Sequence, residues 1–237
     1  MHLSSALSKV VYYMQLPFKS VRPGLLALLA LHLANPLLSL AAENEITLEP
    51  QVALRISRLY SEGRREKRES GEPDCLAVYA GRDRSLLKFD LSAIPQGAKV
   101  QKATLELTAW TAYGSNPDEI PSEVFKITTD WDPAAVGWVE NKADEDWVNK
   151  GGDAVGIDGS EITPKKGPWG DPYAANTANP ANQEPMEWDV TALVNEWVSG
   201  QSPNYGMMLA SWGTNRLCFY DGSTGQGIPV LRIKLTK

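Results

Sequence analysis

The chain has 237 residues and a formal net charge of −6, from 23 basic and 29 acidic residues. This length is enough for one domain with a sizeable core. The acidic balance argues against nucleic acid or an anionic membrane surface as the main partner, because both require a net basic surface.

Residues 1–42 have the pattern of a signal peptide that is removed on export. The run LLALLALHLANPLLSLAA (25–42) follows three basic residues and ends in a small-x-small cleavage pattern. A retained membrane anchor is the alternative, but the run is shorter than the roughly 20 apolar residues that a membrane span needs. The true start is Met1 or Met14. We therefore expect a secreted or extracytoplasmic protein with no membrane span after leader removal and one domain, residues 43–237.

The expected mature chain is more acidic than the whole and contains no histidine. Removing three basic residues leaves 20 basic residues against 29 acidic ones, a net charge of −9. Both histidines, His2 and His32, lie in the leader. This excludes Ser-His-Asp and Cys-His catalysis, histidine-ligated zinc and the commonest general base in the mature protein.

Most of the mature chain consists of short segments that alternate apolar and polar residues. In ATLELTAW (103–110), the four residues Ala103, Leu105, Leu107 and Ala109 are expected to face inward. Such segments, separated by turn residues, predict an all-β antiparallel sandwich or barrel. The other segments are 45–60, 75–81, 85–92, 123–131, 205–212, 216–222 and 229–237.

Two segments depart from this pattern. Residues 131–188 are rich in Pro, Gly, Asn and Ala and show little periodicity, which predicts a long loop insertion that is functional or poorly ordered. DVTALVNEWVSG (189–200) predicts one short helix with Asp189 or Thr191 as its cap and Gly200 as a left-handed end. Its apolar stripe, which we expect to cover an open edge or the mouth of the core, is Leu193, Val194, Trp197 and Val198.

Two cysteines remain after the leader, Cys75 and Cys218. An exported protein folds in an oxidising compartment, and an even count permits one disulfide. Two buried free thiols are the alternative, and the sequence leaves both open.

Several pieces in order resemble a DNRLRE-domain protein, of the group related to carbohydrate-binding module family 96. They are LAVYAG, SLLKFDLSAIPQGAKVQKATLELT, KITTDWDPAAVGW, DVTALVNEWVSG with NYGMMLAS, and GQGIPVLRIKL, within residues 76–235. The resemblance implies an exported jelly-roll β-sandwich that accompanies enzymes acting on polysaccharides. Relatives bind acidic polysaccharides such as alginate through basic residues on a sheet face. This chain departs from them in carrying no attached catalytic domain and in its net charge of −9.

A basic stripe is the first candidate ligand site. Its residues fall on the polar sides of predicted strands: Lys88, Lys126, Arg232 and Lys234, with Arg216 beside them. If the strands are neighbours, these cations could pair with uronate carboxylates. The alternative is ordinary solvent-facing residues offset by nearby acids. A structure that scattered Lys88, Lys126, Arg232 and Lys234 over both faces would contradict the acidic-polysaccharide interpretation that rests on this stripe.

The second candidate is aromatic. Trp169 and Tyr173, in GPWGDPY, lie in the predicted loop and offer flat rings for stacking on a sugar. Alternatively, these rings fold the long loop back onto the sandwich. Trp110, Trp147 and Trp212 are also not explained by the family pattern.

Calcium is a further expectation, and no other cofactor is expected. The candidate oxygen ligands are Asp144, Asp146 and Asp153, with Glu145 and Asp158 nearby. The segment does not match an EF-hand loop, and a solvated acidic loop is the alternative.

The sequence therefore predicts an exported, non-catalytic carbohydrate-binding module, with a polysaccharide ligand and no catalytic residue. Secreted enzymes or cell-surface components are further possible partners. A structural or interaction protein that binds no sugar is the main alternative. A polysaccharide lyase or hydrolase accessory is a third, because carboxylates are plentiful.

Overall fold

A computed structural model describes residues 45–58, 75–95, 97–113, 120–164, 167–178 and 184–236. These residues belong to one compact unit, Ala42–Lys237. The expected signal peptide, residues 1–42, lies outside the described residues. Within them, no helix is both long enough and apolar enough to cross a membrane.

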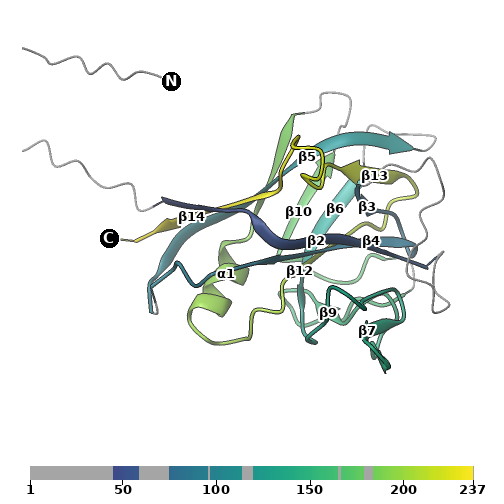
Figure 1. Ribbon diagram of the computed structural model, residues 1–237, viewed down its shortest axis with the longest axis horizontal. Helices are drawn as coiled ribbons and strands as arrows, with labels where there is room; N and C mark the ends of the chain where they lie inside the picture. Colours follow the sequence, from purple (N-terminus) through teal and green to yellow (C-terminus); the bar gives the residue numbers. More distant parts are fainter. Residues whose placement is uncertain are drawn as a thin grey trace, which may run out of the picture. The chain divides into compact units, whose positions relative to one another are not determined.

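Two antiparallel sheets pack face to face (Figure 1). Sheet A contains β1 (Glu45–Leu48), β14 (Val230–Leu235), β5 (Val100–Tyr113), β13 (Arg216–Phe219) and β3 (Leu76–Val78) in that order, with β11 (Pro185–Asp189) also on β5. Sheet B contains β10 (Ala174–Ala178), β6 (Ile120–Ile127), β12 (Met207–Ala210), β4 (Asp83–Phe89) and β2 (Pro50–Ser57), with β9 (Ala154–Val155) also on β6. The predicted all-β antiparallel sandwich, of jelly-roll type, is confirmed.

Alternating residues of the two sheets fill the space between them. On β5 the inward residues are those expected from the pattern, and they meet Leu87 and Phe89 of β4 and Val124 of β6. Sheet A also contributes to this core Leu217 and Phe219 of β13 and Trp188 of β11. Burial of this apolar surface is the main stabilising contribution to the fold.

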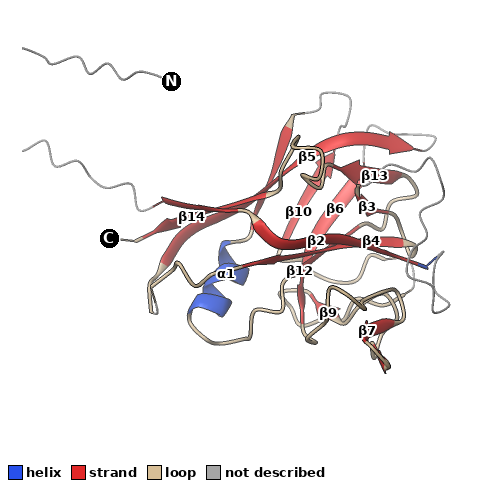
Figure 2. Cartoon of the chain, viewed as in Figure 1, coloured by secondary structure: helices blue, strands red, loops and turns tan. Residues whose placement is uncertain are grey.

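The single helix within the described residues, α1 (Thr191–Val198), lies at one end of the sandwich (Figure 2). Its buried residues are Leu193, Val194 and Trp197, as the stripe predicted. The capping differs from the expectation: Val190 is the N-cap, and Asp189 instead accepts a hydrogen bond from the N–H of Thr191 (3.1 Å). Gly200 has φ +76°, the left-handed conformation expected after the helix.

Much of the segment expected to be a long loop insertion is a packed third layer, but its strands β10 and β11 belong to the two sheets. It contains β7 (Glu140–Lys142), β8 (Glu145–Asp146) and β9, and the sequence pattern also missed β10 and β11. Its tryptophans, Trp131, Trp138, Trp147 and Trp169, pack on the outer face of sheet B, against Phe125 and other residues there. Figure 1 shows β7 and β9 on the side of β12 away from β5. Both faces of sheet B are therefore buried over much of its area.

Of the two alternatives for the cysteines, the structure has the disulfide. Cys75, just before β3, is joined to Cys218 of the neighbouring strand β13, with Cα atoms 5.4 Å apart. Both side chains are buried beside Trp110 on the outer side of sheet A.

Candidate functional site

The five cations of the predicted basic stripe do not lie on one face. Lys88 lies on the outer side of sheet B, whereas Lys126 is in register with the inward-facing Met207. Arg232 and Lys234 lie on the outer side of sheet A, and Arg216 begins β13. The prediction that these residues form one stripe is wrong. Alternation could not reveal this, because it does not tell which face of a strand meets solvent when both faces of the sheet are covered.

Arg232 and Lys234 lie on the outer face of sheet A among charges of both signs. Arg232 Nε donates to Glu106 Oε2 at 3.1 Å, which raises the pKa of Arg232. Lys234 is opposite Lys102 on β5 and Glu45 on β1. The surface here is the balanced polar face that exposed sheets usually carry. A binding role for this pair stays a prediction.

Lys126 and Tyr173 meet at the helix end of the sandwich. Lys126 Nζ is 2.6 Å from Glu196 Oε2 of α1, and the Tyr173 hydroxyl donates to Glu196 Oε1 at 2.7 Å. Burial raises the pKa of Glu196, but the hydrogen bonds from Lys126 and Tyr173 outweigh it and hold that pKa below its usual range. These bonds fasten α1 to β6 and to the segment before β10.

Trp169 is only 8% exposed, so it offers no ring face for a sugar to stack on. It packs edge-on against Phe125, with ring centroids 5.9 Å apart. The alternative interpretation, that this ring folds the long segment back onto the sandwich, is the one that the structure has.

A buried arginine, Arg84, connects the third layer to sheet B. The Arg84 guanidinium lies 5.2 Å from the ring centroid of Trp138 and 5.3 Å from that of Trp169. It donates to the carbonyl of Gly151 at 2.8 Å and to that of Thr163. Burial lowers the pKa of Arg84 to about 9. This cation is a structural tie between β4 and the third layer.

The expected calcium ligands do not gather. Asp153 is buried, and its carboxylate accepts hydrogen bonds from Thr129 Oγ1 (2.9 Å) and from the N–H of Asn149 (2.7 Å), so it organises its own loop. Asp144 and Asp146 are exposed on the β7–β8 hairpin. The described residues contain no group of three or more His, Cys, Asp or Glu side chains that could hold a metal. Calcium binding stays a prediction.

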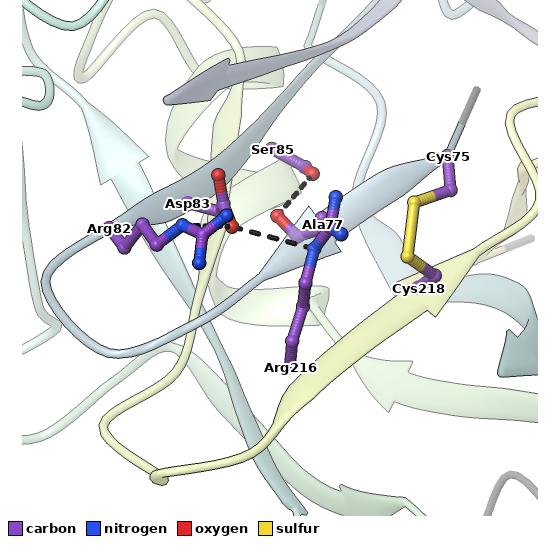
Figure 3. Close-up of a disulfide and its surroundings, with 7 residues drawn as sticks. All are labelled: Cys75, Ala77, Arg82, Asp83, Ser85, Arg216 and Cys218. Atoms are coloured by element: carbon purple, nitrogen blue, oxygen red, sulfur yellow. Dashed lines mark hydrogen bonds and ion pairs between the residues drawn. A yellow bond between two sulfur atoms is a disulfide. The ribbon is translucent and has the colours of Figure 1, made fainter. Parts of the chain in front are cut away.

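Three arginines gather at the end of the sandwich opposite α1. Asp83 begins β4 and is 1% exposed, and its Oδ2 lies 3.6 Å from Arg82 Nε and 3.5 Å from Arg216 Nε (Figure 3). On β2, Ser57 is opposite Asp83, and Arg55 lies two residues away on the same face. We call Arg55, Arg82 and Arg216 the arginine cluster. Arg82 and Arg216 face the Asp83 carboxylate, and Arg55 lies on the same face of the neighbouring strand β2.

The turn that connects β3 to β4 sets the position of Arg82. The Arg82 N–H donates to the Tyr79 carbonyl at 3.0 Å, and Gly81 has φ +64°, a conformation that glycine adopts without strain. The Arg82 guanidinium lies 5.5 Å from the ring centroid of Tyr79. A short turn, an aromatic ring and a buried carboxylate thus fix this side chain at the molecular end.

Sequence reasoning found only Arg216 of this cluster. Alternation indicates polar residues on the outer sides of strands. Arg82 lies in a turn, and Arg55 lies on the inward face near the end of β2. The available signal was Gly81-Arg82-Asp83-Arg84, which places alternating charges shortly after the apolar strand LAV.

The structure thus defines an all-β sandwich module with the arginine cluster beside the buried Asp83 at one end. A family model matches residues 75–235, that of the disaggregatase related repeat domain. This match covers more than half of the chain, and the chain belongs to this family. β1 and β2 precede the matched residues. No curated protein matches the chain. The matching family carries a different name from the DNRLRE family expected above, so that finer resemblance stays an interpretation.

Proposed function

We propose that this protein is an exported, non-catalytic module that binds an acidic polysaccharide at the arginine cluster. The sequence resemblance to DNRLRE domains related to carbohydrate-binding module family 96 supports the ligand class. The leader-like residues 1–42 support export. The observation that carries the proposal is that contacts with Asp83 and Tyr79 fix the Arg82 guanidinium while part of it stays exposed.

Arg82 is held in place on one side and open on the other. Its Nε lies near Asp83 and its plane lies over Tyr79, while the side chain remains 31% exposed. In the part of the chain that the structure describes, neither Nη nitrogen has a hydrogen-bond or ion-pair partner. Two parallel N–H donors on a fixed guanidinium suit the two oxygens of a carboxylate. Little conformational entropy is lost on binding, because the side chain is already ordered.

The local charge also favours an anion. Arg55 and Arg216 bring two further guanidinium groups to the end of the sandwich that carries Arg82. Arg55 and Arg216 have further interactions of their own, so the donors that we expect to contact the ligand are the Nη groups of Arg82. A local positive region on a chain of net negative charge restricts where an anionic polymer can bind.

A non-catalytic role fits the chemistry of this end. Asp83 is buried between two guanidinium groups and is not placed to act as a general acid. The expected mature chain has no histidine to replace it. A structural protein without a sugar ligand is the alternative, and it becomes the conclusion if no polysaccharide binds.

Affinity electrophoresis tests the proposal with alginate, polygalacturonate and a neutral glucan, with and without Ca²⁺. We expect the mature protein to be retarded by an acidic polymer, and Arg82→Ala to bind it about tenfold more weakly because a charge-assisted bidentate contact is lost. Lys88→Ala, near the opposite end of β4 from Arg82 and Asp83, is the matched control and should bind as wild type. Equal binding by Arg82→Ala and wild type would contradict the site. Loss of binding only in Arg232→Ala/Lys234→Ala would move the ligand to the face of sheet A.

A further inference from the structure

Trp212 is the most exposed of the eight tryptophans, with 39% of its surface accessible. It lies in the turn between β12 and β13, at the same end as the arginine cluster. The Ala80 N–H donates to the Gly213 carbonyl at 3.4 Å, which joins this turn to the one that carries Arg82. An exposed indole therefore stands close to the proposed anion site.

The indole is fixed although it is exposed. Its Nε1–H donates to Glu123 Oε1 on β6 at 3.0 Å. The Gly213 N–H donates to Ser211 Oγ at 3.1 Å and tightens the turn. Gly167 lies so close that a Cβ there would be 2.9 Å from Trp212 Cβ, so the third layer supports the base of the side chain. A ring held in this way can stack on a ligand with little loss of entropy.

Glu123 has a hydrogen-bonding capacity that the protein does not use. Its side chain is 8% exposed, and Oε2 has no hydrogen-bond partner. A buried acceptor without a donor is uncommon and calls for an explanation. Because Oε2 is buried, a ligand on the indole does not reach it, and Glu123 acts at this surface only through the hydrogen bond that Oε1 accepts from Trp212.

The surface next to this pair carries small side chains. Ala175 is opposite Glu123, and Thr177 is opposite Pro121, on the edge strand β10. Both Ala175 and Thr177 are exposed. A flat ring lying on the indole would therefore meet no large side chain from this strand.

We propose that Trp212 is a stacking subsite for one pyranose ring of the polysaccharide whose anionic group binds Arg82, an inference that rests on the proposed function. The C–H face of the ring packs on the indole. Glu123 is a positioning residue, because its Oε1 accepts the hydrogen bond from Trp212 Nε1–H that orients the indole. The ligand class is thus an anionic polysaccharide that presents a flat apolar ring face beside its charge.

Titration of an alginate hexasaccharide and a neutral glucan hexasaccharide, followed by tryptophan fluorescence, tests this inference. We expect Trp212→Ala to weaken alginate binding about tenfold while leaving its dependence on salt unchanged, because stacking is not a charge effect. Trp212→Phe should retain most of the affinity and lose the fluorescence change. Glu123→Ala should weaken binding, and Glu123→Gln, which keeps an acceptor for the indole N–H, should restore it. Trp110→Phe, on sheet A, is the control and should change neither.

The outcomes separate the two proposals. Wild-type affinity in both Trp212 variants, with weak binding by Arg82→Ala, overturns the stacking subsite and leaves the proposed function standing. Binding of the neutral glucan that Trp212→Ala abolishes, with no alginate binding by wild type, supports the stacking subsite and overturns the acidic ligand. Absence of any binding by wild type overturns both. Thermal unfolding of each variant identifies a change that acts only through the fold.

Discussion

At the scale of single residues, Arg84 is the most constrained cation in the described structure. It is 1% exposed, lies between two tryptophan rings and donates to two backbone carbonyls of the third layer. Such a group stabilises a fold only while its donors are satisfied, because a buried unpaired polar group costs about 1–3 kcal/mol. Lysine has the same charge but lacks the planar fork.

We expect Arg84→Lys to lower the free energy of unfolding by about 2 kcal/mol or more, because one carbonyl bond and the planar stacking are lost. Urea denaturation measures this change. The control is Arg232→Lys, an exposed arginine, for which a change within about 0.5 kcal/mol is expected. Equal losses in the two variants would show that Arg84 does not tie the third layer to β4.

Glu196 makes stability depend on pH. Its pKa in the fold lies below the ordinary value of 4.5, because the hydrogen bonds from Lys126 and Tyr173 outweigh the effect of burial. The stabilisation from its ionised form is therefore present above pH 4.5 and is lost as the pH falls through the lowered pKa. We expect Glu196→Gln to be less stable than wild type by about 1 kcal/mol at pH 7 and the difference to shrink towards pH 3. Thermal unfolding at several pH values measures it, and a difference that grows in acid would contradict the assignment.

At the scale of elements, the strands and the helix were predictable, and the third layer was not. Strand β5 alternates because one face meets the core, and α1 has its stripe because it covers one end. On β4 and β6 the residues Leu86 and Phe125 also face apolar neighbours, so the alternation that marks an exposed face disappears. The partners of these faces come from a segment without periodicity, and only the folded structure shows where its tryptophans pack.

The residues of the candidate site likewise divide into those that the sequence could predict and those that it could not. Arg232 and Lys234 were placed correctly on the polar side of β14, because alternation along one strand is local information. The meeting of Arg82, Arg216 and Asp83 joins a turn, β13 and β4, and no local pattern indicates which strands become neighbours. Both interpretations of Trp169 stayed open for the same reason, since a loop ring is exposed or buried according to what it packs against.

The disulfide ties β3 to β13 across 143 residues of sequence. We expect Cys75→Ser/Cys218→Ser to lose about 4–5 kcal/mol of stability in the chain-entropy model, because a long loop is no longer closed in the unfolded chain. Urea denaturation with and without a reductant is the measurement. Reductant should destabilise wild type to the level of the double variant and leave the variant unchanged. A wild-type protein whose urea denaturation is the same with and without reductant would contradict this account.

At the scale of the whole molecule, charge is distributed unevenly. The chain is acidic overall, yet Arg82 and Arg216 meet the buried Asp83 at the end opposite the helix. The third layer covers much of the outer face of sheet B, and the described outer face of sheet A carries mixed charges. The open guanidinium edge of Arg82 and the exposed ring of Trp212 lie on turns joined by a hydrogen bond, so this end combines a charged and an apolar contact.

The salt dependence of alginate binding, measured by calorimetry for wild type and Arg82→Ala, tests the central claim most directly. An ion pair with Arg82 predicts that wild-type affinity falls as salt rises from about 0.05 to 0.5 M, because screening shortens the range of charge interactions. The same account predicts weaker binding and a smaller salt dependence for Arg82→Ala. Identical affinities and identical salt dependence for the two proteins would contradict it.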